Sequence, residues 1–531
     1  MRRTRKKMLV VGLSSLAMLA AACGSSNKNT STATTEVGGS AAVSTTAGGA
    51  TTSTTAGPTP TSISEWEALW TKQRDAVVKR IKDNKWGKSA DGKTLTGPGG
   101  WTVDLSKCPA SWSDTEGVTD TTIKIGQAIP LSGSYAEYAN LAKGINFLFG
   151  YYGEQGLFKD TTTGKARTVQ YNAKDDGYDA ARTIPLIDEM LDSEKDFAVW
   201  TLGSSPTLKT YDKTNQRCVP QPFAMTAHAA FGDPVNHPWT TGAVQLSYNL
   251  EGILWETWIE QHVNEFPAGQ KIKVASLVQN NDFGKSYDAA FRAAVASSPV
   301  LKDRIDYFNE TIEPSAPTVS DPMTTMTAKS PDVWISMLAG AQCTQIVNEA
   351  AQDGLKGKAK YLFLPQGCAG SSFIGKAKLG GDGSAGDGWL TVSPGIKDMN
   401  DPAFKNDAYV NWLRDAMKAK GLNPDASATL GSGVNYGFPA VQALAIAGQL
   451  PGGVTRSNYM LAIRTIDMTD PMLVTGMKLR MDGANDAFIV QGGVYQRWDA
   501  ANQTFVNQGA VLDLDGKEKN CSFDQSTSSC K

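Results

Sequence analysis

The sequence has few of the residues that build metal sites and nucleic-acid surfaces. Its 531 residues include only three histidines, His228, His237 and His262, which lack the close spacing of metal ligands. Lysine and arginine together number 51 against 53 aspartates and glutamates, and beyond the first seven residues the positive charges are dispersed. A nucleic-acid surface needs clustered positive charge. We therefore expect no nucleic-acid partner, no metal and no cofactor.

Motifs of nucleotide binding and of nucleophilic catalysis are also missing. The glycine-rich run 380–388 lacks the Lys-Ser/Thr ending of a phosphate-binding loop and is typical of a surface turn. No Gly-x-Ser-x-Gly nucleophile elbow occurs. His228 follows Thr226 closely, but we expect it to lie at the rim of a ligand site or to contact the ligand rather than to activate a serine. These absences favour a binding protein over an enzyme.

Only one long apolar run is present, and it lies at the start of the chain. Arg2, Arg3, Arg5, Lys6 and Lys7 precede the apolar residues 8–22. A run of this length is too short to cross a bilayer as a helix, which takes about 20 residues, and it is typical of an export signal.

The apolar run ends in a sequence that resembles a bacterial lipobox. In Ala20-Ala21-Ala22-Cys23-Gly24, small residues precede a cysteine, although alanine replaces the usual leucine at position 20. Residues 24–62 are nearly all Ser, Thr, Gly and Ala, a composition that behaves as a flexible coil. We expect a lipid on Cys23 that anchors an extracytoplasmic protein to the cell membrane. A plain cleaved signal is the alternative.

Six further cysteines remain, and an even number in an exported chain favours disulfides. Cys521 and Cys530 can close a short loop near the C-terminus. Cys343 and Cys368 each follow a predicted strand, so neighbouring loops can bring them together, which would leave Cys108 for Cys218. Fifteen pairings are possible for six cysteines, and this is the one we expect.

From Thr121 onward, apolar strand-like segments alternate with helical patterns. One series of alternating elements runs to about residue 224 and a second from about residue 250 to 392. Such alternation predicts an α/β fold with parallel sheets covered by helices, and two series predict two lobes. Before them, residues 63–86 form an amphipathic helical pattern and residues 87–118 a predicted loop. Further helices and hairpin-like strands after residue 400 indicate that the chain crosses between the lobes more than once.

Five stretches fall in an order found in one protein family. They are 123–138, which carries Pro-Leu-Ser-Gly after a strand, then 202–207, 281–287, 353–367 and 438–444. Together they resemble the leucine/isoleucine/valine-type (type I) periplasmic binding proteins of ABC importers over residues 120–515. The resemblance implies a two-lobed Venus flytrap, with each lobe a mainly parallel sheet covered by helices. It also implies three crossovers, which we place near Val244, Ser393 and Val474.

The expected organisation follows from these crossovers. It comprises a signal peptide 1–22, a tether 23–62, an extension 63–118, lobe 1 at 119–243 and 394–473, lobe 2 at 244–393 and 474–515, and a tail 516–531. The resemblance implies a monomer that captures a small molecule between the lobes and delivers it to the permease subunits of an ABC importer. An amino acid, an amide or urea, and a carboxylate remain open as the ligand.

The resemblance also implies which residues contact the ligand. Ser204 and Ser205 lie between a strand and a helix, where hydroxyls and free N–H groups suit a carboxylate. Thr226 and Ala227 end the next strand. Tyr138 matches an aromatic residue that lines the cleft, and Phe283 stands where many relatives carry a stacking tyrosine. Helix capping and plain packing are the structural alternatives for these positions.

Gln366 is the most informative departure from the family. Amino-acid binders commonly place a glutamate there to neutralise the ligand ammonium, and a carboxamide carries no charge for that purpose. The companion position, often tyrosine, is here Ala339-Gly340. Either Asp176 or Asp282 supplies the negative charge, or the ligand is not zwitterionic.

Two other functions remain open from the sequence. A sensory module of the same fold would usually be joined to a transmembrane segment. An envelope hydrolase, or a purely structural lipoprotein, is the other alternative, and a hydrolase would show turnover that depends on Ser204 or Ser205.

Overall fold

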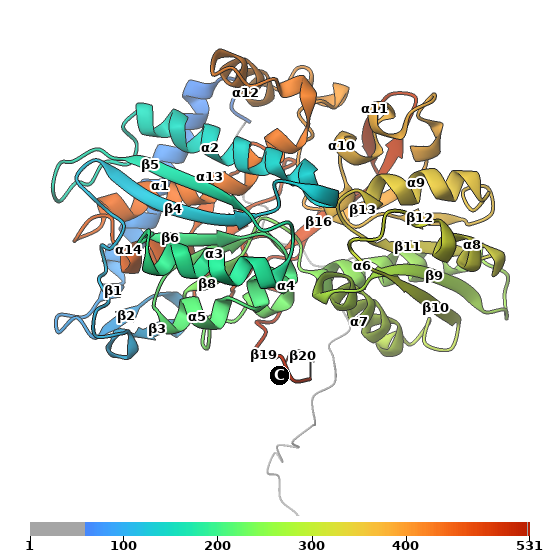
Figure 1. Cartoon of the computed structure of the whole chain (residues 1–531), viewed down its shortest axis with the longest axis horizontal. Helices are drawn as coiled ribbons and strands as arrows, with labels where there is room; N and C mark the ends of the chain where they lie inside the picture. Colours follow the sequence, from blue (N-terminus) through green and yellow to red (C-terminus); the bar gives the residue numbers. More distant parts are fainter. Residues whose placement is uncertain (1–58, 528, 531) are drawn as a thin grey trace, which may run out of the picture. The chain divides into compact units, whose positions relative to one another are not determined.

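The computed structural model describes residues 59–527, 529 and 530. The expected signal 1–22, the lipidation residue Cys23 and most of the expected tether lie outside these residues. Within them the chain forms two α/β lobes, each with its own sheet and its own buried apolar residues (Figure 1). The expected fold class is therefore confirmed.

Lobe 1 is built on a parallel sheet in which β4 lies between β5 and β6. Leu202 follows β6 and Met225 follows β7, and a parallel β-bridge between these two residues links β6 to the parallel pair β7–β8. Pro222 lies within β7 and has no N–H to donate, which accounts for the interrupted ladder. The strands are β4 (Thr122–Ile129), β5 (Thr168–Asp175), β6 (Ala198–Thr201), β7 (Gln221–Ala224) and β8 (Thr240–Gly242).

Helices cover both faces of this sheet. Figure 1 shows α2 and α13 on one face and α3 on the other. The helices of lobe 1 are α2 (Ala139–Glu154), α3 (Ala180–Asp192), α4 (Ser204–Leu208), α5 (Tyr211–Gln216), α12 (Ala408–Ala419), α13 (Thr429–Gln449) and α14 (Arg456–Arg464). A Cβ atom at Gly433 would lie 2.3 Å from the carbonyl oxygen of Leu141, so glycine allows α2 and α13 to pack closely.

Lobe 2 has a single larger sheet in the order β10-β9-β11-β12-β13-β16-β17, with β18 also paired to β16. The pairs up to β13 are parallel, and β16 to β18 are antiparallel additions. The strands are β9 (Ile272–Gln279), β10 (Ile305–Ile312), β11 (Val333–Met337), β12 (Tyr361–Phe363), β13 (Leu390–Ser393), β16 (Gly492–Asp499), β17 (Thr504–Asn507) and β18 (Leu512–Asp513).

The helices of lobe 2 follow the same alternating pattern. They are α6 (Tyr248–Gln261), α7 (Asp282–Ser297), α8 (Ser320–Ala328), α9 (Gln342–Gln352), α10 (Ser371–Ile374) and α11 (Lys376–Leu379). Asn281 begins α7 by accepting a hydrogen bond from the Gly284 N–H, the usual role of an asparagine at this position.

The chain crosses between the lobes near two of the three expected places. Val244 belongs to the buried cluster of lobe 1 and Leu246 to that of lobe 2, while Val392 packs in lobe 2 and Ile396 against lobe 1. The third crossover was expected near Val474, and this is wrong.

The segment after Val474 stays with lobe 1 for a further 16 residues. Met477, Leu479, Met481, Ile489 and Val490 all belong to the buried cluster of lobe 1, and the chain enters lobe 2 only at β16. The cause is a short antiparallel pair, β14 (Asp467–Met468) with β15 (Leu479–Arg480), which turns the chain back onto lobe 1.

The extension 63–118 is an integral part of lobe 1. Helix α1 (Ile63–Asp83) buries Trp70 completely against Tyr409 and Phe438. The following segment, predicted to be a loop, instead contains an antiparallel sheet of β1 (Gly87–Lys88), β2 (Thr94–Thr96) and β3 (Thr102–Asp104). Leu95 and Val103 point inward from this sheet and anchor it to the lobe.

The C-terminal tail returns from lobe 2 to lobe 1 and so makes a fourth crossing. Leu514 packs with lobe 2, Glu518 lies at the crossovers, and Phe523 packs against buried residues of lobe 1. The last strands, β19 (Phe523–Asp524) and β20 (Ser529–Cys530), form a small hairpin.

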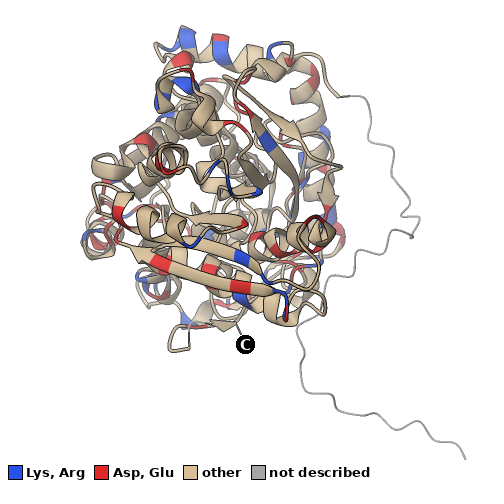
Figure 2. Ribbon diagram, turned by 90° about the vertical axis from the view of Figure 1, so that its right-hand side faces the viewer, with Lys and Arg blue, Asp and Glu red and all other residues tan. Residues whose placement is uncertain are grey.

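Three disulfides join the pairs that the sequence favoured, Cys108–Cys218, Cys343–Cys368 and Cys521–Cys530. In the view of Figure 2, acidic and basic positions are interspersed over the ribbon. No helix among residues 59–527, 529 and 530 is both long and apolar enough to cross a membrane.

Candidate ligand site

A cavity lies where the two lobes meet, close to the crossovers. It encloses about 910 Å³ of space free of protein atoms, including the part open to solvent. The wall consists of Tyr138, Leu141, Tyr178, Leu202, Gly203, Met225, Gln245, Tyr248, Phe283, Ala339, Gln366, Gly367, Ala369, Gly370, Ser372, Phe373, Ile396, Lys397, Asp398, Ala428, Thr429, Ser432 and Tyr436.

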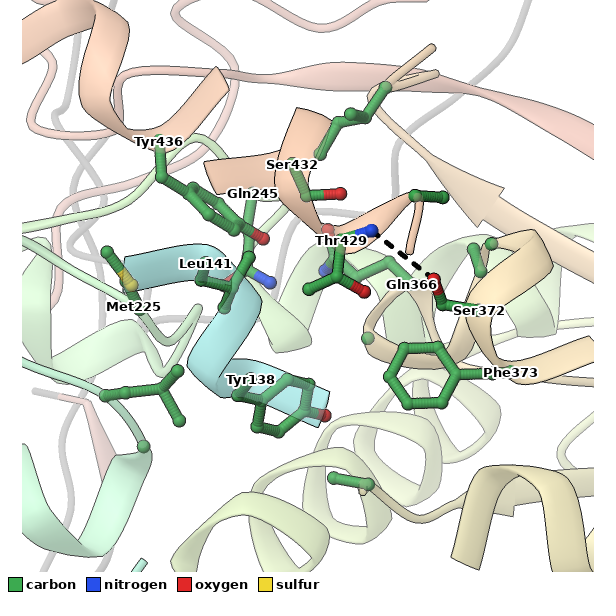
Figure 3. A pocket seen from close by; sticks show the side chains of 18 of the residues that line it. Tyr138, Leu141, Met225, Gln245, Gln366, Ser372, Phe373, Thr429, Ser432 and Tyr436 are labelled. Carbon is green, nitrogen blue, oxygen red and sulfur yellow. Dashed lines mark hydrogen bonds between the residues drawn. The ribbon is translucent and has the colours of Figure 1, made fainter. Parts of the chain in front are cut away.

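Both lobes contribute aromatic rings to this wall. Tyr138, Tyr178 and Tyr436 come from lobe 1, and Tyr248, Phe283 and Phe373 from lobe 2. Figure 3 shows Tyr138, Phe373 and Tyr436 around the same space, with Gln245 and Ser432 between them. The rings of Tyr138 and Phe373 meet edge to face across the lobes, with centroids 6.0 Å apart.

Hydrogen bonds hold the lobes together around the cavity. The backbone N–H of Ser371 in lobe 2 donates to Asp398 Oδ2 of lobe 1 over 2.7 Å. In the other direction, the N–H of Thr429 donates to the Ser372 hydroxyl over 3.3 Å, the dashed line of Figure 3. An ion pair of 3.1 Å between Lys378 and Glu137 adds to them. The structure is therefore a closed form in which α10 and α11 of lobe 2 touch lobe 1 beside the cavity.

Three of the seven predicted ligand residues line the cavity. Tyr138 contributes its ring, and its hydroxyl accepts a hydrogen bond of 3.2 Å from the N–H of Gly340 in the other lobe. Phe283 lies against Tyr248, with ring centroids 5.2 Å apart. Gln366 is the third. Their positions as ligand contacts stay a prediction.

The other four predicted residues do not belong to the wall. Ser204 is fully buried behind Gly203, and its hydroxyl bonds the Thr226 hydroxyl at 2.9 Å, which in turn lies 3.3 Å from the Tyr248 hydroxyl. These hydroxyls therefore support the wall from behind. Ala227 is buried and its carbonyl accepts the N–H that begins α6.

Ser205 makes a contact between the lobes instead. Its hydroxyl accepts a hydrogen bond of 3.4 Å from the N–H of Asp282, the first residue of α7 in lobe 2. The α4 loop thus meets the second lobe directly, and the space expected for a carboxylate at this serine is taken by protein.

Gln366 is bound on all sides by protein groups. Its amide oxygen accepts from the Leu246 N–H at 3.0 Å, and its amide nitrogen donates to the Leu246 carbonyl and to Glu251 Oε2 at 2.7 and 2.8 Å. Its own backbone N–H donates to the other Glu251 oxygen. The side chain therefore ties the strand after β12 to the first crossover, and only the remaining surface of its amide faces the cavity.

Glu251, which the sequence did not single out, lies behind this glutamine. It is fully buried in α6, and burial raises its pKa to about 8 despite hydrogen bonds from Tyr287 and Gln366. Its carboxyl group is thus predominantly neutral at pH 7. It supplies no formed negative charge to the cavity.

Neither proposed alternative acid lies in the wall. Asp176 is buried and accepts hydrogen bonds from the Tyr178 N–H and the Thr183 hydroxyl, and burial raises its pKa to about 6. Asp282 begins α7 outside the wall. The charged residues of the wall are Lys397 and Asp398, which follow the second crossover.

His228 lies away from the cavity wall and beside the C-terminal tail. Its ring meets Phe523 edge to face, its Nδ1 accepts the Ala230 N–H, and burial lowers its pKa to about 4. His228 was expected at the rim of a ligand site. The tail instead covers this residue, and only 6% of its surface is exposed.

Several wall residues had no signal in the sequence. Thr429, Ser432 and Tyr436 are spaced along one face of the first half of α13, and Ser372 and Phe373 come from the short α10. Residues spaced by three or four positions lie on one face of a helix. The sequence of α13 is apolar or small on nearly every side, so it does not indicate which face lines a cavity.

The chain is similar to known proteins both in its sequence pattern and in its fold. A family model described as periplasmic binding protein matches residues 122–503. No curated protein matches the sequence.

Solved structures resemble the chain at low sequence identity. The fatty acid ABC transporter substrate-binding protein from Thermomonospora curvata is 15% identical, covers 82% of this chain and 98% of its own, and has a TM-score of 0.61. A branched-chain amino acid ABC transporter protein from Thermus thermophilus with bound valine is 14% identical, with coverage of 75% and 98% and a TM-score of 0.62. A solute-binding protein from R. palustris in complex with benzoate is 17% identical, with coverage of 76% and 100% and a TM-score of 0.56.

Proposed function

The chain belongs to the periplasmic binding protein family, and on that premise we propose that it captures one small molecule in the cavity between its lobes and delivers it to the permease of an ABC importer. The solved relatives that share its fold hold a valine or a benzoate, and one is named for fatty acids, so ligand type varies widely on this framework. The protein is proposed to work as a lipid-anchored monomer outside the cytoplasm.

The observation that carries this proposal is the cavity itself. It is walled by both lobes, and the chain segments that connect the lobes run beside it. A ligand that contacts both walls stabilises the closed form relative to an open one, in which those contacts are lost. The bonds from Ser371 to Asp398 and from Thr429 to Ser372 join the two lobes in this structure, and we propose that closure around the ligand makes such contacts and creates a surface that a permease can recognise.

A binding test with product analysis examines this function. The purified chain is screened by thermal unfolding against amino acids, aromatic and aliphatic carboxylates, amides and ureas. A ligand present at 100 times its Kd stabilises the folded state by about 2.7 kcal/mol. We expect a saturable shift, a smaller radius of gyration on binding, and an unchanged ligand by mass spectrometry. Turnover of the ligand, or a screen without any saturable shift, would count against a solute-binding role.

The proposed anchor and transport role need tests in cells. Replacing Cys23 with serine is expected to move the protein from the membrane fraction to the soluble fraction, without changing ligand binding by the purified protein. Uptake of the labelled ligand is expected to fall in cells that lack the chain and to return when it is restored. Normal uptake without the chain would favour the sensory alternative.

A further inference from the structure

A short segment of lobe 1 is bonded directly to one turn of lobe 2. The segment is the 3-10 helix η3 (Gly133–Tyr138), which follows β4 and leads into α2. The carbonyl of Ser134 accepts a hydrogen bond of 2.8 Å from the N–H of Ala341, and the Tyr138 hydroxyl accepts one of 3.2 Å from the N–H of Gly340. Both donors belong to the turn 338–341, which connects β11 to α9. Two hydrogen bonds therefore join the lobes at this place.

Tyr135 of the same segment packs into lobe 2. Its side chain is only 4% exposed and belongs to the buried cluster that contains Phe283, Tyr287 and Ala339 of lobe 2. On the lobe 1 side its ring stacks on that of Tyr178, with centroids 4.2 Å apart. Tyr135 itself is not among the described residues of the cavity wall. It therefore contributes to the contact between the lobes without facing the space for a ligand.

Gly340 provides the room for the ring of Tyr135. A Cβ atom at position 340 would lie 2.7 Å from Cδ1 of Tyr135 and 2.8 Å from the carbonyl oxygen of Ser134, which is closer than atoms of folded proteins approach. The φ of Gly340 is +66°, a conformation that glycine adopts without strain. The family resemblance implied a tyrosine at Ala339-Gly340. In the structure, a tyrosine of lobe 1 occupies the space that a side chain at Gly340 would need.

Each half of this contact is fastened to its own lobe. In lobe 2, the disulfide Cys343–Cys368 lies directly after the turn, and the Cys343 N–H donates to the Gly340 carbonyl over 3.1 Å. In lobe 1, the hydroxyl of Ser132, which precedes η3, donates to Asp175 Oδ2 over 2.6 Å. Lobes that move as rigid bodies would therefore break or re-form this contact as a unit.

On the premise that the lobes open and close as the proposed function requires, we propose that η3 and the turn 338–341 form a latch that keeps the protein closed without a solute. Tyr135 is the positioning residue of lobe 1, and Gly340 is that of lobe 2. Neither residue lines the cavity, so the latch acts on the equilibrium between open and closed forms. The apparent affinity for a solute rises with the fraction of protein in the form that holds it, so the latch strengthens binding without touching the ligand.

The distance between the lobes tests the latch without knowledge of the solute. Asn146→Cys on α2 and Gln352→Cys on α9 give one exposed labelling site in each lobe, in a Cys23→Ser background whose other cysteines form disulfides. Co-purified solute is removed, and pulsed electron paramagnetic resonance between spin labels at the two sites measures the populations of closed and open molecules. We expect the label distance of this structure to predominate. A protein that is mostly open without a solute overturns the proposal.

Gly340→Ala is the main variant, and Gly354→Ala is its matched control. The two glycines have similar positive φ values, +66° and +72°, so alanine strains the backbone of both in the same way. A Cβ at Gly354 has no atom within 4 Å, whereas a Cβ at Gly340 meets Tyr135. We expect Gly340→Ala to lower the ratio of closed to open molecules by about tenfold, and Gly354→Ala to leave it unchanged. Equal ratios in these two variants overturn the latch.

Tyr135→Ala tests the same contact from the side of lobe 1. It removes the ring and leaves Gly340 and the residues of the described wall in place, and it should also lower the ratio by about tenfold. The double variant with Gly340→Ala should lower the ratio by less than the product of the two single effects, because both substitutions break one contact. An unchanged ratio in Tyr135→Ala, or effects that multiply in full, would contradict the assignment of both residues to one latch.

The failure of the latch and the failure of the proposed function give different results. If the lobes are open without a solute but the thermal screen finds a saturable ligand, the latch is wrong and solute binding stands. If the variants open the protein as expected but no compound binds, the latch stands and solute capture fails.

Discussion

Lobe 1 is assembled from distant parts of the chain, whereas the parallel strands of lobe 2 come from the single stretch 272–393. Helix α1 of the extension, the core strands β4 to β8, and helices α12 to α14 all contribute to lobe 1, and the tail adds Phe523. The disulfide Cys108–Cys218 within lobe 1 spans 110 residues, whereas Cys343–Cys368 within lobe 2 spans 25. Lobe 1 therefore depends on long-range connections, and lobe 2 on a local succession of strands and helices.

This difference predicts which lobe is the more rigid one when the lobes close. The extension ties parts of lobe 1 together, because Trp70 donates to the carbonyl of Thr469 and Arg74 to the amide oxygen of Gln442. Arg456 of α14 does the same by bonding the carbonyls of Ser113, Asp196 and Phe197. A lobe fastened in this way can act as a rigid base against which lobe 2 moves.

The largest expected effect compares the two disulfides. In the loop-entropy model, removing Cys108–Cys218 costs about 4.8 kcal/mol of unfolding free energy and removing Cys343–Cys368 about 3.5 kcal/mol. Serine pairs at each site, compared by urea unfolding, measure the difference of roughly 1 kcal/mol. A greater loss from the lobe 2 pair would contradict the view that lobe 1 depends more on long-range links.

The next comparison concerns one buried acid in each lobe. The pKa of Glu251 is raised to about 8 and that of Asp176 to about 6, in both cases mainly by burial. The folded state then holds the proton more tightly than the unfolded state, so each acid lowers stability as pH rises from its ordinary pKa to its raised one. The penalty grows by about 1.4 kcal/mol per pH unit within that window.

Amide variants of these acids separate the two windows. The stability of Glu251→Gln relative to the parent is expected to grow as pH rises from about 4.5 to 8, by up to a few kcal/mol. The corresponding gain of Asp176→Asn should stop growing near pH 6 and stay constant above it. Urea unfolding at pH 5, 6, 7 and 8 measures both. If the unfolding free energies of the two variants changed with pH in the same way, the pKa of Glu251 would not be raised above that of Asp176.

The sequence was sufficient for the architecture because the pattern of alternating elements is strong. The family resemblance implied the crossovers near Val244 and Ser393, and in the structure the buried residues change lobe between Val244 and Leu246 and between Val392 and Ile396. The third was misplaced because Leu479 and Arg480 look like part of the final strands of lobe 2 but pair back with Asp467 and Met468. Two-residue strands carry too little pattern to reveal their partner.

The site was predicted less completely, for a different physical reason. Tyr138, Phe283 and Gln366 were chosen from the family resemblance, and all three line the cavity, while their contact with a ligand stays a prediction. Ser204 and Thr226 lie at equally suitable strand ends, yet their hydroxyls bond each other, a pairing that depends on which strands are neighbours. The wall residues Ser432 and Tyr436 come from a buried helix whose facing side only tertiary packing decides.

The fourth crossing offers a smaller test of the two-lobe comparison. Removing the tail 516–531 takes away Phe523 and the half-buried Glu518, which accepts a hydrogen bond from the Ser247 hydroxyl at the start of α6. We expect a loss of about 1–2 kcal/mol in unfolding free energy and a larger radius of gyration in the ligand-free protein. The double variant Cys521→Ser/Cys530→Ser keeps the tail and should show a smaller change. An unchanged radius after truncation would show that the tail does not restrain opening.

The smallest expected effect comes from the ion pair between Lys378 of α11 and Glu137, which joins the lobes beside the cavity. Since the Lys378 side chain is 41% exposed, Lys378→Ala should change the unfolding free energy by less than about 1 kcal/mol. If this pair is lost when the lobes open, ligand affinity should fall in the variant, by no more than about fivefold, and less at high salt. Lys376→Ala, on the same short helix but without an ion pair among the described residues, should leave affinity unchanged. An equal response of the two variants would show that the electrostatic contact contributes nothing to closure and that the hydrogen bonds around Ser372 and Asp398 suffice to hold the lobes together.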